Sequence, residues 1–333
     1  MSTLNAGAEQ IPDAPAPVVA PADEADVAAA APAPPAVTPP AKLPWGERPR
    51  SIRKGRDGAT SKSLKAAGLS AARSEDDGQE RAPKGRTSRT TFLRTEKTTV
   101  VPPEPAPADG ASASSAEPTV HFLYNVGSQA AEADAAYANL TISKPKLAEN
   151  DYHTLAELAV QSADGRQIVE VGWNVDRLVN GDDDPHLFVY HWIDRKTSCY
   201  NTCGFVQYSK TIKPGDTLVQ DTQKRFGIQF FNGAWWVAYD TEWVGYFPGE
   251  LWGGTFTRSG LVQVFGEVAA STEKPCTEMG NGKKADDTKA AKVGSVAYLN
   301  GPTVDMHVRS TSDLYPVSKL STRTFRYGGP GAC

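Results

Sequence analysis

The sequence has no long apolar runs and no strong excess of charge of either sign. No segment approaches the ~20 consecutive apolar residues that a helix needs to cross a bilayer, so we expect no membrane-spanning helix. A formal net charge of −4 over 333 residues gives no reason to expect nucleic acid or an anionic membrane as a partner. The first ten residues, MSTLNAGAEQ, lack the basic segment of a recognisable secretory signal peptide.

Cysteine is scarce, and its four copies all lie in the C-terminal part, at Cys199, Cys203, Cys276 and Cys333. An even number in a folded domain favours disulfides and an oxidising compartment, with three connectivities open, although reduced thiols in a cytosolic protein are the alternative. The spacing of Cys199 and Cys203 does not match a zinc knuckle, and no histidine pair with ligand spacing accompanies them. The chain also has no nucleophile elbow, P-loop or dinucleotide motif. We therefore predict neither a metal nor a cofactor.

The composition changes near residue 115. Residues 1–115 are rich in Ala, Pro, Ser, Thr and charge, a composition that cannot hold helix or sheet, so we predict a disordered region and consider it a candidate pro-segment. Its basic part, residues 48–94, could recruit an acidic partner, but a solvated tail is the commoner case. Of seven tryptophans, all but Trp45 lie beyond residue 170, so the core is expected there.

Residues 116–333 have the pattern of an all-β domain. Short runs rich in Val, Ile, Phe, Tyr and Trp alternate with Gly, Asn, Asp and Pro, which is typical of an antiparallel β-sandwich. Asn232-Gly233, between RFGIQFF and AWWVAYD, predicts a β-hairpin with a type I′ turn. The one helical pattern is a short stretch at residues 152–160. The predicted fold is an antiparallel β-sandwich preceded by a long disordered N-terminal region.

Two glutamates interrupt strands whose neighbours are apolar: Glu170 in QIVEVGWNV and Glu267 in LVQVFGEVA. Most strand glutamates face solvent, and either residue could do so. If the two carboxylates meet in one cleft, like-charge repulsion and burial raise one pKa and leave the other low. The ionised member can then take a proton from water while the protonated member hydrogen-bonds a scissile carbonyl. The pair is therefore a candidate hydrolytic dyad.

A cluster of aromatic residues offers an alternative function. Its members lie in and beside one predicted hairpin: Trp235, Trp236, Tyr239, Trp243, Tyr246 and Phe247. They could line a groove for a glycan or a peptide, which would make the protein a non-catalytic β-sandwich binding module. Core packing on both faces of the hairpin explains the cluster equally well.

Several segments, in the same order along the chain, resemble the neprosin family. VEVGWNV, Val169 to Val175, is similar to the family's Glu-x-Gly-Trp-x-Val strand, and CYNTCGFVQ, Cys199 to Gln207, to its Cys-Tyr-Asn…Cys-x-Gly-Phe-Val-Gln segment. NGAWWVAY, VGYFPGELW, VFGEV and EMGNG match further pieces of the family pattern in turn. Two features depart from it: Phe265 replaces a tryptophan, and residues 1–115 do not resemble the family's N-terminal activation domain.

The resemblance implies a β-sandwich glutamic endopeptidase that acts best in acid and cleaves on the carboxyl side of proline. The family's two catalytic glutamates fall on Glu170 and Glu267, the residues that strand context had already singled out. We further expect Trp173 and Tyr190, on and next to the same strand, to bind substrate. The expected partners are proline-containing peptides or proteins.

The resemblance also bears on the cysteines and on localisation. It implies a local Cys199–Cys203 disulfide, which leaves Cys276 and Cys333 as the second candidate pair. An extracellular location is expected, although the start of the chain shows no recognisable signal peptide.

Overall fold

The computed structural model describes residues 37–50, 87–89 and 119–333. Nearly all regular structure in these ranges is strand, and the helical elements there are short: α2 (Arg177–Asn180) and the 3-10 turn η2 (Gly249–Trp252). The predicted all-β class is therefore confirmed. In the described ranges, no helix has the length and apolar character to span a membrane.

One sheet, here called sheet A, contains the strands with the candidate glutamates. Its strand order is β1-β2-β11-β4-β5-β6, with β13 also paired to β2, and all the pairings are antiparallel. The strands are β1 (Thr87–Arg89), β2 (Thr119–Ala130), β11 (Leu261–Ala270), β4 (His153–Gln161), β5 (Ile168–Val175), β6 (His186–Trp192) and β13 (His307–Ser310). β4 lies between β11 and β5, so it separates the two strands that hold Glu267 and Glu170.

The other sheet, sheet B, has eight strands in the order β14-β15-β12-β3-β8-β9-β10-β7. They are β14 (Val317–Ser321), β15 (Thr324–Tyr327), β12 (Lys292–Leu299), β3 (Ala135–Ile142), β8 (Thr222–Phe231), β9 (Ala234–Tyr239), β10 (Glu242–Pro248) and β7 (Val206–Gln207). The predicted hairpin is confirmed as β8–β9, because Asn232 and Gly233 have φ angles of 48° and 73°, the two positive values of a type I′ turn.

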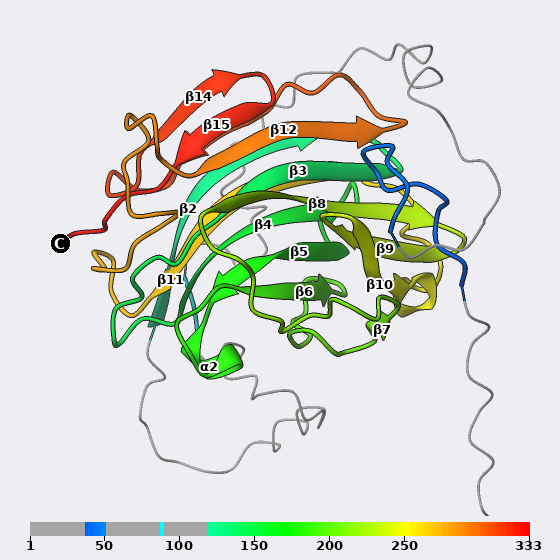
Figure 1. Cartoon of the computed structure of the whole chain (residues 1–333), viewed down its shortest axis with the longest axis horizontal. Helices are drawn as coiled ribbons and strands as arrows, with labels where there is room; N and C mark the ends of the chain where they lie inside the picture. The colour runs from blue at the N-terminus through cyan, green and yellow to red at the C-terminus, as the bar shows by residue number, and fades with distance from the viewer. Residues whose placement is uncertain (1–36, 51–86, 90–118) are drawn as a thin grey trace, which may run out of the picture. The chain divides into compact units, whose positions relative to one another are not determined.

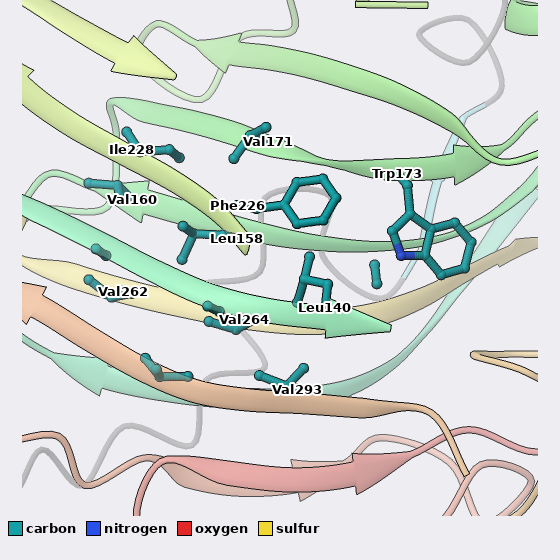
Figure 2. Packing of buried hydrophobic residues seen from close by; sticks show 14 of the residues in the cluster. Leu140, Leu158, Val160, Val171, Trp173, Phe226, Ile228, Val262, Val264 and Val293 are labelled. Carbon is teal, nitrogen blue, oxygen red and sulfur yellow. The ribbon is translucent and has the colours of Figure 1, made fainter. Parts of the chain in front are cut away.

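The main core lies between the two sheets, which Figure 1 shows running one behind the other. In β3 every second side chain is buried, the alternation of a strand with one face on the core. Leu140 and Phe226 from sheet B meet Leu158 and Val171 from sheet A in this layer (Figure 2). A second buried apolar cluster, which includes Leu155, lies on the opposite face of sheet A.

The prediction of a short helical stretch at residues 152–160 is wrong, because this segment forms strand β4. Every residue of β4 is buried, with the main core on one face and the second apolar cluster on the other. A strand buried on both faces shows no alternation of polar and apolar residues, so its pattern does not distinguish it from a buried helix.

The disorder expected throughout residues 1–115 does not hold for residues 37–50, which pack on the outer face of sheet B. Leu43 is 2% exposed in a cluster with Trp236 and Trp243, and the Trp243 indole donates a 3.0 Å hydrogen bond to the Pro40 carbonyl. Composition predicted disorder because prolines surround this segment, but its few apolar side chains find a partner surface. Apart from β1, the rest of residues 1–115 lies outside the described ranges.

Both disulfides have the connectivity that the family resemblance implied. Cys199 is bonded to Cys203, and Cys276 to Cys333 across a sequence separation of 57 residues. The second bond ties the last residue of the described chain back to the loop that follows β11.

Candidate active site

Glu170 and Glu267 point to the same face of sheet A. Glu170 on β5 pairs with Ala159 on β4, and Ala159 pairs in turn with Gln263 on β11. Directly paired residues share a face, and so do residues two apart on one strand. Glu267, four residues after Gln263, therefore faces the same way as Glu170. This surface, opposite the inter-sheet core, is called the glutamate face.

A third glutamate, Glu157 on β4, lies between the two. It pairs with Gly172 on β5 and with Phe265 on β11, so it is one diagonal step from Glu170 and one from Glu267. The outer two are two strands apart and offset by four residues. At ~4.8 Å per strand and ~3.3 Å per residue, their α-carbons are on the order of 16 Å apart. The three carboxylates thus follow one diagonal row across the sheet.

Sequence reasoning missed Glu157, although the signal was present. Once LAELAVQ is assigned as a strand, Leu155, Glu157 and Ala159 share one face, and Glu157 is the charged residue among them. The assignment of residues 152–160 as a helical stretch hid this alternation.

The spacing of the Glu-x-Gly-Trp motif now has a physical explanation. Glu170 points to the glutamate face, and Trp173 points to the core between the sheets. A β-carbon on Gly172 would lie 2.7 Å from the β-carbon of Glu157 and 2.2 Å from the Ala156 carbonyl oxygen. Gly172 therefore leaves the room that Glu157 occupies.

Glu170 is held by an indole. The residue is 1% exposed, and its Oε1 accepts a 3.0 Å hydrogen bond from Nε1 of Trp192 on β6. Tyr190, the direct strand partner of Glu170, has its ring centroid 5.3 Å from that of Trp192 and 5.1 Å from that of Tyr200. Three aromatic rings therefore gather next to this carboxylate.

Glu267 is held by a histidine. Its Oε1 lies 2.6 Å from Nε2 of His153 on β4, and both side chains are 0% exposed. The other ring nitrogen of His153, Nδ1, lies 3.5 Å from Oδ2 of Asp176, which is equally buried. Asp176 also caps helix α2, because its side chain accepts hydrogen bonds from the backbone N–H groups of Leu178 and Val179. The contacts form a continuous chain from a helix cap to a candidate catalytic carboxylate.

The two expected substrate-binding residues lie on opposite faces of sheet A. Tyr190 lies on the glutamate face beside Glu170. Trp173 is 0% exposed in the core (Figure 2), and its indole donates a 2.9 Å hydrogen bond to the Thr141 carbonyl. A contact between Trp173 and substrate does not fit this placement, since alternation along β5 turns its side chain away from Glu170.

The aromatic cluster of β9 and β10 packs on both faces of its hairpin. Trp235 and Phe247 belong to the inter-sheet core, while Trp236, Trp243 and Tyr246 pack with residues 37–50. All five residues are at most 5% exposed. These five rings therefore form no open groove for a glycan or a peptide.

The described residues contain no group of three or more His, Cys, Asp or Glu side chains that could hold a metal ion. A surface hollow is lined by residues such as Glu132, Asp164, Gln167 and Arg258, and none of the three glutamates of the row takes part in it.

Comparison with known proteins adds a family and several distant structures. The Neprosin family model matches residues 150–330. SCP-B, a member of the eqolisin family of peptidases solved with the tripeptide Ala-Ile-His, is 10% identical, with a TM-score of 0.39 over 63% of this chain and 99% of that chain. Scytalido-glutamic peptidase with a transition state analog inhibitor is 8% identical, with a TM-score of 0.41 and the same coverage. CG-16, a homodimeric agglutinin from chicken liver, is 13% identical, with a TM-score of 0.29 over 44% of this chain and 93% of that chain.

Proposed function

Because the chain belongs to the neprosin family, whose model matches more than half of its 333 residues, we propose that it is a glutamic endopeptidase that cleaves after proline in acid. The observation that carries the proposal is the buried row of Glu170, Glu157 and Glu267 on the face of sheet A opposite the main core. A buried carboxylate is costly for stability, so a row of three is expected only where a site uses them.

The row supports hydrolysis by water activation. Neighbours in the row, Glu170 with Glu157 and Glu157 with Glu267, carry like charges in a buried site and disfavour each other's ionisation, so protonated and ionised glutamates coexist over a range of pH. An ionised glutamate takes a proton from the attacking water, and a protonated one donates a hydrogen bond to the scissile carbonyl oxygen. Of the two family glutamates, Glu170 and Glu267, one has each role, and acid pH is needed to keep one of them protonated.

The aromatic residues beside Glu170 support the preference for proline. Tyr190, Trp192 and Tyr200 are in mutual ring contact next to this carboxylate. The flat, apolar ring of proline packs well against aromatic faces. These three side chains are at most 6% exposed, so a proline ring reaches them only where this face opens to substrate, and its following peptide bond would then lie toward the row of carboxylates.

The disulfides support an extracellular location. Cys199–Cys203 and Cys276–Cys333 both require an oxidising environment to form and persist. The proposed substrates are proline-containing peptides or proteins outside the cell, and we propose no role for nucleic acid or a membrane as a partner.

The test is cleavage of a quenched proline-containing peptide from acid to neutral pH by the wild type, Glu170→Gln and Glu267→Gln. We expect cleavage after proline that is limited to acid pH. Each substitution should lower kcat/KM by at least about 100-fold, because it removes a group that transfers a proton in the transition state.

The matched control is Glu242→Gln. Glu242 is the first residue of β10 in sheet B, where its carboxylate accepts a hydrogen bond from Thr211, and it lies outside the glutamate row. It should leave both activity and melting temperature unchanged. Equal cleavage by the two row variants and the wild type would refute the proposal, as would a wild type that is inactive after removal of its N-terminal region.

A further inference from the structure

His153 lies between two carboxylates, and each of its ring nitrogens faces one of them. Nε2 is 2.6 Å from Glu267, and Nδ1 is 3.5 Å from Asp176. A neutral imidazole carries a proton on only one of its two nitrogens, so with both carboxylates ionised one of these contacts would set a lone pair against carboxylate oxygens. An imidazolium has a proton on both nitrogens and is attracted to both carboxylates. The geometry therefore favours the charged ring.

We propose that His153 is a positioning residue that stays charged in the folded protein and keeps Glu267 ionised, which makes Glu267 the general base of the reaction. Asp176 orients the imidazole ring and favours its charge. Glu170, which accepts a hydrogen bond from the neutral indole of Trp192, is then the glutamate that donates a proton to the scissile carbonyl. The inference rests on the proposed peptidase activity and assigns a role to each member of the pair.

Other ionisable groups lie near this pair. Glu157 lies on the same face of β4, and Tyr124 on β2 is the direct strand partner of Glu267. Next to Asp176, the guanidinium of Arg177 is turned away, since it donates to the Leu147 and Ala148 carbonyls and pairs with Asp183. On β13, Arg309 pairs with Val126, two residues from Tyr124 and on the same face, so a cation also lies on the glutamate face near Glu267.

Two substitutions separate charge from shape. His153→Gln keeps an N–H donor near Glu267 but removes the positive charge. Asp176→Asn removes the negative charge, and it should preserve the cap of α2, because Asn and Asp are about equally good at the N-cap position. Both variants should fold, which thermal unfolding would verify.

The measurement is kcat/KM against pH with the full-length chain, because the acid limb of this profile reports the protonation of the essential base in the free enzyme. Without the nearby cation Glu267 takes up its proton at higher pH, so the acid limb should move up by about one to three pH units in His153→Gln. Asp176→Asn should move it in the same direction by a smaller amount. A loss of activity by the same factor at every pH would indicate a purely structural role and would overturn the inference.

His186→Gln is the matched control. His186 also contacts a carboxylate, with its Nε2 2.8 Å from Asp182, but it lies on β6 and its other ring nitrogen contacts the Gly215 carbonyl. Its substitution should leave the acid limb in place. An equal shift in this control would mean that any loss of a histidine charge moves the profile, and the specific role of His153 would be refuted.

A measurement that does not need activity separates the two proposals. With 15N-labelled histidine, the His153 signals are identified by their loss in His153→Gln. We expect both ring nitrogens to be protonated at pH 7.5, where an unperturbed histidine with a pKa of about 6.5 is neutral. A His153 that loses its proton at or below pH 6.5 would overturn the inference. An inactive wild type with a charged His153 would refute the peptidase function and leave the charge assignment standing.

Discussion

At the scale of single residues, Glu157 is expected to set the upper pH limit of activity. When Glu157 is ionised, its charge disfavours ionisation of the neighbouring protonated glutamate, which therefore keeps its proton to higher pH. Glu157→Gln keeps the volume and removes that charge. The alkaline limb of the kcat/KM profile should then move to lower pH by about one unit, the opposite limb from the one that His153 controls.

The same assay with Glu242→Gln as the control checks this prediction. An alkaline limb that stays in place in Glu157→Gln, with activity otherwise normal, would show that this residue takes no part in the site. Thermal unfolding at each assay pH separates this effect from loss of the fold, because the unfolded fraction itself varies with pH.

How far the sequence predicts the site depends on the kind of contact each residue makes. Glu170 and Glu267 could be chosen from the sequence because each interrupts an apolar strand, whereas Trp173 was expected at the site although strand alternation places it on the opposite face from Glu170. The partners of Glu267 could not be chosen in this way. His153 lies 114 residues before it along the chain, and only the antiparallel pairing of β4 with β11 brings the two together. Asp176 looks like an ordinary helix cap in the sequence, and its approach to His153 depends on the register of β4 with β5.

At the scale of elements, residues 37–50 act as a strap on sheet B, and Leu43 is their main apolar anchor. Leu43→Ala should lower the free energy of unfolding by about 2–4 kcal/mol, because it removes a fully buried side chain. It should also shift tryptophan emission to longer wavelength, since Trp236 and Trp243 lie under the strap. Chemical unfolding followed by fluorescence measures both effects.

Leu178→Ala is the control for the strap, because Leu178 is 52% exposed and its truncation should cost little. Equal stability of the two variants would mean that the strap does not dock in solution. The strap also shows why composition failed here. Proline density correctly indicates that a segment cannot form its own core, but it does not reveal a complementary surface elsewhere in the chain.

At the scale of the whole molecule, His191 should make the fold less stable in acid. Its side chain lies in the inter-sheet core, with its ring centroid 4.9 Å from that of Phe247, and burial lowers its pKa from 6.5 to about 4. Between these two values the unfolded chain binds a proton at this residue and the folded chain does not. Stability therefore falls as the pH drops through this window, by on the order of 3 kcal/mol in total at pH 4 and below.

Substitution of His191 tests whether stability and activity in acid can be separated. His191→Gln has no group that titrates in the window, so the difference in unfolding free energy between pH 7 and pH 4, measured with urea, should shrink by most of that amount. His307→Gln is the control, because His307 is exposed and its substitution should leave the difference unchanged. If His191→Gln and the wild type lose the same stability, His191 does not set the acid limit of the fold. If the difference shrinks while the pH profile of cleavage stays in place, the core histidine limits survival in acid and the glutamate row sets the chemistry.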